Sequence, residues 1–367
     1  MATLQACRQI QLQFEPKLNE LGKGKRLADG LSAVVQIENT LWLAHDETDT
    51  LERLTLSETG RTGQFSATDH NQFSLHDFLT LPVSTKNTRT RQQEIDIEGL
   101  AYADGYLWLT GSHSLKRNKP KPDQNVNRNQ NRLANIIREG NRFLIARIQI
   151  ETHKGSYRLG KTHKKRSAAS LQGDKNDNEL TKALAHDPHL AAFLSIPGKD
   201  NGFDIEGLAV INDRLFLGLR GPVLRGWAVI LEIELDGQGR HLQTIGPNRQ
   251  LYRKHFLQLG GLGIRDLCFR NADLLILAGP SMALDGPVSV FCWQNAGKVK
   301  DESFINATQL QKVIDIPFGH GDDHPEGMAL FYPPNAKSAT LLIVNDAAAK
   351  QRRPKKNRML ADIFPLP

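Results

Sequence analysis

A short sequence unit recurs five times along this chain and limits its possible folds more than any other feature. The copies open with Asp29-Gly-Leu-Ser, Asp96-Ile-Glu-Gly-Leu-Ala, Asp204-Ile-Glu-Gly-Leu-Ala, Ile264-Arg-Asp-Leu-Cys and His324-Pro-Glu-Gly-Met-Ala. The aligned positions Glu206, Arg265 and Glu326 are 59 and 61 residues apart, and Asp29 and Glu98 are 69 apart. A period of this length indicates an array of supersecondary units, such as a propeller or a solenoid.

Each unit reads as a meander of strands. Turn residues such as Asp104-Gly105 and Asn212-Asp213 separate two apolar runs after each opening, which is the pattern of a β-hairpin. A third strand is predicted at residues 51–56, 142–150, 227–235 and 288–293. A fourth is predicted at residues 78–82, 193–197 and 313–317. The unit is therefore expected to form one four-stranded blade.

The last unit lacks one strand, and the N-terminus supplies a candidate for it. Strands are expected at 328–332, 341–344 and 361–364, and the apolar run 10–14 can complete the blade. Pairing the two chain ends closes the ring and removes exposed sheet edges. The predicted fold is an all-β propeller of about five blades, with six possible if the long second unit conceals another. A solenoid or a sandwich has no need of such a donated strand.

The second unit is longer than the others. The step from Glu98 to Glu206 is 108 residues, and the excess falls in two polar, basic stretches. We expect these to be loop insertions at about 115–141 and 152–178 within a single domain that spans residues 1–367.

The composition excludes several classes of protein. Apolar residues make up 39% and charged residues 24%, which is ordinary for a globular domain and excludes global disorder. No apolar signal core opens the chain and no 18-residue apolar run is present, so we expect a cytoplasmic protein without a membrane span. The three cysteines show no zinc-ligand spacing, so they favour neither a structural zinc site nor a disulfide framework.

The net charge of +7 is unevenly distributed. Lysine and arginine cluster at 86–91, 116–142, 154–166 and 350–358. The first, second and fourth clusters are expected at the end of the propeller where the inner strands begin. They indicate either an anionic partner or solvated loops. Nucleic acid is a possible partner, but no helix-turn-helix, zinc-finger or RNP pattern supports it.

Acidic residues of the openings are expected to converge at that same end. The inner strand of a blade starts where the second strand finishes, so repeated positions meet around the axis. We predict that Glu98, Glu206, Glu326 and Asp323 hold a divalent cation such as Ca²⁺ or Mg²⁺, because hard cations prefer oxygen ligands. The alternative is that these acids accept backbone hydrogen bonds and only support the fold.

Other residue types near this end complete a candidate site. His113 and His324 are candidates for proton transfer, and Lys116, Arg220 and Arg265 for binding an anion such as a phosphoester or a polyphosphate. Arg265 is also a candidate counter-charge for the acids. A serine–histidine–acid triad is disfavoured, because no serine lies in a GxSxG motif.

The openings at Asp96 and Asp204, together with Leu107-Trp-Leu-Thr-Gly-Ser-His-Ser, resemble a bacterial family of unknown function. The resemblance covers most of the chain and implies a propeller. The Glu-Gly-Leu-Ala element is also similar to the phytase-like, or esterase-like, propeller family, which implies metal-dependent phosphate-ester chemistry. Glu98, Glu206 and Glu326 match the motif, whereas the fourth unit departs from it with Arg265 and Asp266.

Two functional hypotheses follow. The first is a metal-dependent hydrolase of a phosphorylated or otherwise anionic small molecule. The second is a non-catalytic propeller scaffold that binds a protein or another anionic partner through the same face. No organic cofactor is indicated.

Overall fold

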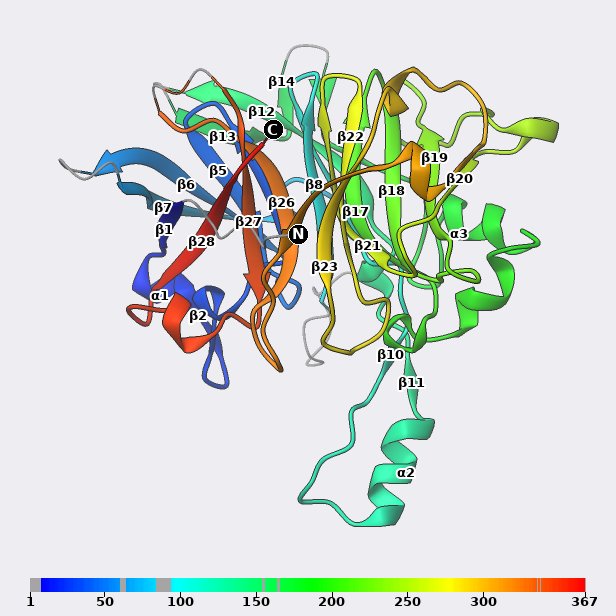
Figure 1. Ribbon diagram of the computed structural model, residues 1–367, viewed down its shortest axis with the longest axis horizontal. Coiled ribbons are helices and arrows are strands. Elements are labelled where there is room, and N and C mark those ends of the chain that lie inside the picture. Colours follow the sequence, from blue (N-terminus) through cyan, green and yellow to red (C-terminus); the bar gives the residue numbers. More distant parts are fainter. Residues whose placement is uncertain are drawn as a thin grey trace.

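Five antiparallel blades surround a central axis in the computed structural model, which describes residues 8–59, 64–83, 94–153, 156–163, 166–334, 336 and 338–366 (Figure 1). The first blade holds β4 (Ala33–Ile37), β5 (Thr40–Ala44), β6 (Thr50–Thr59) and β7 (Gln64–Ser74). The second holds β8 (Ile97–Ala103), β9 (Tyr106–Gly111), β12 (Ile145–His153) and β13 (Ser156–Gly160). The third holds β17 (Asp204–Ile211), β18 (Arg214–Gly221), β19 (Ala228–Glu234) and β20 (Arg253–Leu257). The fourth holds β21 (Gly263–Arg270), β22 (Asp273–Gly279), β23 (Val288–Trp293) and β25 (Gln311–Ile316).

The two chain ends share the fifth blade, as predicted. It consists of β26 (His324–Phe331), β27 (Thr340–Asp346), β28 (Arg358–Pro365) and β1 (Arg8–Gln13). β1 is antiparallel to β28, with Ile10 opposite Ala361, and lies parallel to β7 of the first blade. The N-terminal strand therefore closes the ring, which confirms the five-bladed propeller.

The glycine of the repeated opening lets adjacent inner strands pack closely. β8, β17, β21, β26 and β4 contact one another in that order around the axis, and β4 returns to β8. A Cβ atom on Gly99 would lie 2.6 Å from Leu208 Cβ, and one on Gly327 would lie 3.0 Å from Ala33 Cα. Only a residue without a side chain fits between strands at these distances. The repeat thus encodes the close approach of neighbouring blades.

The strand pairing corrects the alignment of the first unit. Gly99 is paired with Thr110, and the equivalent position of the first blade is Ala33, which is paired with Ala44. Ser32 therefore occupies the place of Glu98, and its hydroxyl donates to the backbone oxygen of Ile97 at 2.6 Å. Asp29 lies earlier, in a 3-10 turn, and does not belong to the ring of inner-strand residues.

Two of the predicted fourth strands are wrong. Residues 78–82 follow a 3-10 turn and form no strand, and residues 193–197 lie largely in the 3-10 helix Ala191–Ser195. The outer strands of these two blades are β7 and β13, which carry many polar residues. Short apolar runs do not distinguish a strand from a helical turn. The third prediction, 313–317, overlaps β25.

The long second unit contains additional elements. Within the predicted insertion 115–141, residues 116–138 form an arm built from β10 (Lys116–Arg117), α2 (Val126–Ala134) and β11 (Ile136–Ile137). Residues 152–178 are not loop throughout, because they include β13 and the short strands β14 (Thr162–His163), β15 (Arg166–Ser167) and β16 (Ala169–Ser170). α3 (Glu179–Leu184) follows. The remaining elements are α1 (Pro16–Asn19), β2 (Glu20–Gly22), β3 (Lys25–Arg26) and β24 (Ser303–Ile305).

The hydrophobic core lies between the blades. Trp42 of the first blade and Leu107 of the second belong to one buried cluster, and comparable clusters fill the other gaps between blades. Cys292 is buried and Cys268 is half-buried, and both are free thiols. In the part of the chain that the structure describes, no helix is long and apolar enough to span a membrane.

Candidate functional site

The start of each inner strand meets the end of its blade's second strand at one end of the axis, which we call the mouth. Ile97 pairs with Gly111, Asp204 with Gly221, Gly263 with Gly279 and His324 with Asp346. Because this pairing repeats in four consecutive blades, side chains from distant parts of the chain gather at the mouth.

Two adjoining cavities open at the mouth. The smaller has a volume of about 320 Å³ and the larger about 470 Å³. Five residues line both cavities: Lys119, Lys199, Arg220, Glu326 and Asp346. The smaller cavity is also lined by Glu98 and Asp204. The two cavities therefore form one continuous, strongly charged hollow.

Arginines neutralise two of the acids in the inner ring. The Arg265 Nη1 atom lies 3.1 Å from Glu206 Oε2, and its Nη2 atom contacts Glu326 Oε1. The buried Arg220 contacts the other carboxylate oxygen of Glu206, lies 3.7 Å from Asp204 Oδ2 and donates from Nε to the backbone oxygen of Ser281. The fourth unit departs from the repeat at Arg265. This arginine is the counter-charge for Glu206 and Glu326.

Asp266 joins two blades through backbone hydrogen bonds. One carboxylate oxygen accepts from the amide of Leu267 at 2.8 Å, and the other accepts from Met328 of the next inner strand at 2.7 Å. Burial raises the pKa of Asp266 well above its usual range, although these hydrogen bonds oppose the shift. Asp266 stands at the glycine position of the repeat, and its hydrogen bonds connect two blades and so support the fold.

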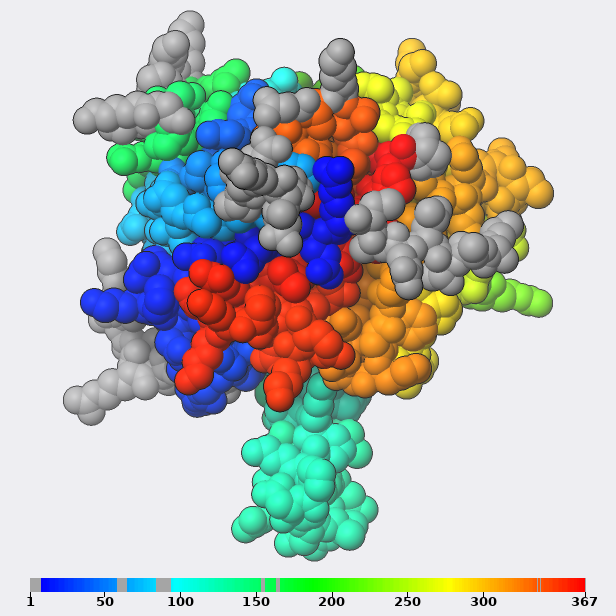
Figure 2. Space-filling model, turned by 60° about the vertical axis from the view of Figure 1, so that its left-hand side comes forward, coloured from blue at the N-terminus to red at the C-terminus, as the bar shows by residue number. Residues whose placement is uncertain are grey.

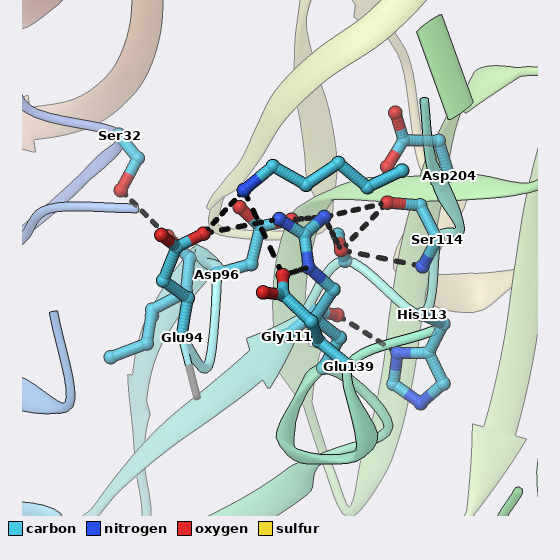
Figure 3. A network of polar contacts seen from close by, with 12 residues as sticks. Ser32, Glu94, Asp96, Gly111, His113, Ser114, Glu139 and Asp204 are labelled. Carbon is cyan, nitrogen blue, oxygen red and sulfur yellow. Dashed lines mark hydrogen bonds and ion pairs between the residues drawn. The ribbon is translucent and has the colours of Figure 1, made fainter. Parts of the chain in front are cut away.

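A second arginine network lies on the side of the mouth nearest the arm (Figure 3). Arg142 contacts Asp96, donates to Glu139 Oε2 at 2.9 Å and to Ser114 Oγ at 3.1 Å, and lies 3.6 Å from Glu94 Oε2. The buried guanidinium is thus surrounded by three acids from two segments. The sequence showed Arg142 only as one member of a basic cluster, because the contacts that define its role are long-range.

Lys116, a predicted anion-binding residue, belongs to the same network. Its Nζ atom lies 2.7 Å from Glu94 Oε2 and 3.8 Å from Glu139 Oε2. Its charge is therefore already balanced within the protein. It positions the base of the arm against the mouth and lines the smaller cavity.

Glu98 has no comparable counter-charge. Its half-buried carboxyl lines the smaller cavity, and it forms no hydrogen bond or ion pair within the described residues. Burial raises the pKa of Glu98 well above its ordinary value, and the charges of Asp96, Glu206, Glu326 and Asp46 raise it further. Glu98 therefore retains a proton at pH values where an ordinary glutamate has lost it.

Two other carboxyl groups of the mouth are shifted in the same direction. Burial raises the pKa of Asp204 to about 7 and that of Glu326 to about 8, although Arg220 and Arg265 oppose these shifts. The acids therefore carry less negative charge near neutral pH than their number suggests, whereas the arginines remain fully charged.

Asp46 lies near Glu98 but in a different environment. The Nδ1 atom of the buried His45 lies 3.0 Å from Asp46 Oδ1. Burial lowers the pKa of His45, but the hydrogen bond and charge of Asp46, with the charges of Asp346 and Glu47, raise it overall. Asp46 and Glu98 line the same cavity.

Two lysines at the mouth carry uncompensated charge. Within the described residues, neither the Lys199 nor the Lys119 side chain forms a hydrogen bond or an ion pair, and both line the two cavities. Burial and Arg220 lower the pKa of Lys199, but the charges of Glu326, Asp96 and Glu206 raise it overall. The sequence did not single out either lysine within its polar stretch.

His113, predicted to transfer protons, is buried outside the two cavities. Its Nδ1 donates to the backbone oxygen of Gly111 at 2.8 Å, and its Nε2 accepts from Asn178 Nδ2 at 2.7 Å. These contacts suit a neutral imidazole, and burial lowers the pKa of His113 to about 4 despite the bond to Gly111. The residue therefore fastens the loop after β9 to the segment before α3.

His324 and Asp323 have different surroundings. His324 lines the larger cavity, where its Nε2 lies 3.1 Å from Asp285 Oδ1. Asp323 accepts from the amide of Ala349 at 2.7 Å and pairs with Arg352 at 2.8 Å. The basic cluster at 350–358 therefore partly serves to hold the last blade together. The cluster at 86–91 lies outside the described residues.

The four acids predicted to bind Ca²⁺ or Mg²⁺ do not form one set. Glu206 and Glu326 are engaged by arginines, and Asp323 is held by Ala349 and Arg352. Over the described ranges, no three His, Cys, Asp or Glu side chains are grouped so as to hold a metal ion. A divalent cation at the mouth stays a prediction, so it is a variable in the assay proposed below.

Glu98→Gln is expected to remove a pH-dependent loss of stability. Because the pKa of Glu98 is raised in the folded state, its contribution to stability is present below the unfolded pKa and is lost as pH rises through the folded pKa. Between pH 5 and pH 9, the melting temperature of wild type should fall relative to Glu98→Gln by a few degrees, the shift that about 1 kcal/mol produces. Glu20→Gln, at an exposed glutamate of β2, is the control. A constant difference between wild type and Glu98→Gln across this range would contradict the prediction.

Comparisons with known proteins identify a family but no activity. A family model described as "Protein of unknown function (DUF3616)" matches residues 30–362. No curated protein matches the chain in sequence. Solved structures similar to the chain include glutaminyl cyclase from Myxococcus xanthus, with 10% identity, a TM-score of 0.38, and coverage of 98% of this chain and 100% of that one. The PQQ-bound aldose sugar dehydrogenase from Streptomyces coelicolor has 10% identity and a TM-score of 0.35, with coverage of 99% of this chain and 97% of that one. At these scores the likenesses carry no argument about function.

Proposed function

The chain belongs to the family of proteins of unknown function (DUF3616), and on the geometry of its mouth we propose that it hydrolyses a phosphorylated or otherwise anionic small molecule. One observation carries the proposal. The smaller cavity brings together Glu98, which has no ion-pair partner in the described residues, and the uncompensated ammonium groups of Lys119 and Lys199. An acid able to give up a proton thus faces the same space as cations able to hold an anion.

The electrostatics of the mouth support an anionic ligand. Asp204, Glu326 and Glu98 keep their protons to higher pH than ordinary carboxyl groups. Near neutral pH the lysines and arginines therefore face fewer carboxylates than the number of acidic residues indicates. The volume of about 320 Å³ suits a small molecule, and the low-dielectric walls strengthen each charge interaction.

Glu98 and Asp46 have complementary roles in the proposed reaction. Asp46, which lines the same cavity and lies beside His45, takes a proton from a water molecule that attacks the phosphorus atom. The bond from phosphorus to the leaving oxygen breaks, and Glu98 gives its proton to that oxygen. One group that gives a proton to the leaving oxygen and one that takes a proton from water are the usual pair in acid–base catalysis.

Phosphate release tests this proposal. Wild type, Glu98→Gln, Asp46→Asn and the control Glu20→Gln would be incubated with p-nitrophenyl phosphate, pyrophosphate and nucleoside triphosphates. Each reaction would run with chelator, Ca²⁺, Mg²⁺ or Mn²⁺. We expect hydrolysis by wild type and the control, and a loss of at least about 100-fold in kcat for Glu98→Gln. Equal rates in Glu98→Gln and wild type, or no hydrolysis of any compound, would overturn it.

A protein-binding scaffold is the second candidate, and one observation favours it. Met282 and Leu284, on a loop beside the larger cavity, are 43% and 64% exposed. Exposed apolar side chains next to a charged mouth are typical of a surface that contacts another protein. Under this alternative, wild type hydrolyses none of the compounds, and Met282→Ser/Leu284→Ser abolishes capture of an acidic partner protein.

A further inference from the structure

The arm that projects beside the mouth is the most basic part of the molecule. It comprises residues 116–138, with β10 paired to β11 at its base and α2 at its tip. Figures 1 and 2 show it extending well away from the propeller. None of the residues of α2 is buried, so the arm contributes nothing to a hydrophobic core.

The arm is nevertheless folded, because polar contacts hold its two sides together. Asn129 accepts from the amide of Lys121 at 2.8 Å and donates to the oxygen of the same residue at 2.9 Å. Arg132 Nε donates to the oxygen of Lys119 at 2.6 Å, and Asn125 caps α2 through the amide of Arg128 at 3.0 Å. At its base, Arg117 Nε lies 2.6 Å from Asp200 Oδ2. A segment ordered in this way, with no core, is suited to binding rather than to stability.

Almost all of the net charge of the chain is on the arm. Residues 116–138 contain seven lysines and arginines and one acid, Asp123, so the arm carries +6 of the total +7. Lys119, Lys121 and Arg128 are exposed, and within the described residues their side chains form no ion pair. Uncompensated like charges on one projection repel one another unless a polyanion neutralises them.

These cations lead from the mouth to the tip of the arm. Lys119 and Arg132 line the smaller cavity. Lys121 lies one step farther along, opposite Asn129, and Arg128 lies in the first turn of α2. A small anion in the cavity cannot reach the last two residues, whereas a linear anion that enters the mouth can contact all four.

We infer that the arm binds a linear chain of phosphate groups and leads one end of it into the mouth. Delivery of the chain end for hydrolysis at the mouth rests on the proposed function. Binding of the phosphate chain by the arm does not depend on that function. Residues 116–142 contain no Phe, Tyr, Trp or His, so the arm has no aromatic platform for base stacking. Recognition therefore depends on phosphate charge, which favours inorganic polyphosphate over single-stranded nucleic acid.

Binding of labelled long-chain polyphosphate to the full-length protein tests this inference. Lys121→Gln/Arg128→Gln removes two cations that form no side-chain contact in the described residues, so folding should be unaffected. Arg240→Gln/Lys300→Gln removes the same charge from exposed positions outside the arm and is the matched control. We expect the arm variant to raise Kd about tenfold and to reduce the salt slope of log K by about 1 to 2. The control should resemble wild type.

Three outcomes would overturn the inference. The first is equal affinity of the arm variant and the control for polyphosphate. The second is binding of tripolyphosphate as tight as that of the long chain. The third is tighter binding of a mixed-sequence single-stranded oligodeoxynucleotide than of polyphosphate. Glu98→Gln separates the two proposals, because it should abolish hydrolysis and leave polyphosphate affinity unchanged. If the long chain binds through the arm and no compound is hydrolysed, the proposed function fails and the arm retains its role.

Discussion

Replacing Arg220 with methionine is expected to lower the free energy of unfolding by about 3–5 kcal/mol at pH 8. The guanidinium is buried, contacts Glu206 and lies 3.7 Å from Asp204. Its removal leaves Glu206 with only Arg265, in a ring where burial already raises the pKa of Asp204 and Glu326. The cost arises from carboxylates left buried without sufficient positive charge.

The pH dependence and a double variant identify this cause. At pH 5 the destabilisation should be smaller, because Asp204 and Glu326, whose pKa values are raised, are then protonated and the ring carries less negative charge. Arg220→Met/Glu206→Gln should recover part of the loss at pH 8, and the cycle measures the coupling of the pair. Denaturant unfolding provides the free energies, with Arg240→Met as an exposed control. A loss of the same size at both pH values, with no recovery in the double variant, would exclude the electrostatic explanation.

Gly99→Val is expected to destabilise the propeller by about 3 kcal/mol or to prevent folding. A Cβ atom at this position would lie 2.6 Å from Leu208 Cβ and 2.9 Å from the Leu208 amide nitrogen. One of these contacts is with backbone, so a change of rotamer cannot relieve it. The ring is closed, and β8 cannot move away from β17 without displacing other blades.

Gly237→Val is the matched control, because a Cβ atom at Gly237 would meet no atom within 4 Å. Soluble yield and the midpoint of chemical denaturation should fall for Gly99→Val and remain near wild type for Gly237→Val. Wild-type stability in Gly99→Val would show that the inner strands are less closely packed than the glycine repeat implies.

The sequence predicted the blades better than it predicted their outer strands. Inner and second strands contain dense apolar runs and turn residues, and these features marked β8, β9, β17 and β18 correctly. Outer strands face solvent on one side, so β7 and β13 carry many polar residues and lack a clear apolar signal. The apolar runs 78–82 and 193–197 were taken for strands in their place.

The candidate site was only partly predictable. The repeat marked Glu98, Glu206, Arg265 and Glu326 as equivalent positions, and the structure places all four at the mouth. The repeat could not show that Asp29 falls outside the ring of inner-strand residues. A 3-10 turn before the first inner strand shifts the alignment of the first unit. The repeat also gave no reason to separate Lys199 or Arg142 from the other basic residues.

The inner and second strands of each blade follow from a pattern that recurs locally, once in each unit. Strand propensity, turn residues and glycine positions act over a few neighbours, so the sequence alone was sufficient to predict these strands and a blade completed by both chain ends. The sequence left five or six blades open, and the structure has five. Which carboxyl groups are neutralised and which keep a proton was decided only by the tertiary structure. Arg265 joins acids of two different blades, whereas Glu98 has no such cation beside it among the described residues. Charge compensation depends on distances of a few ångströms between residues far apart in the chain, and closure of the ring sets those distances.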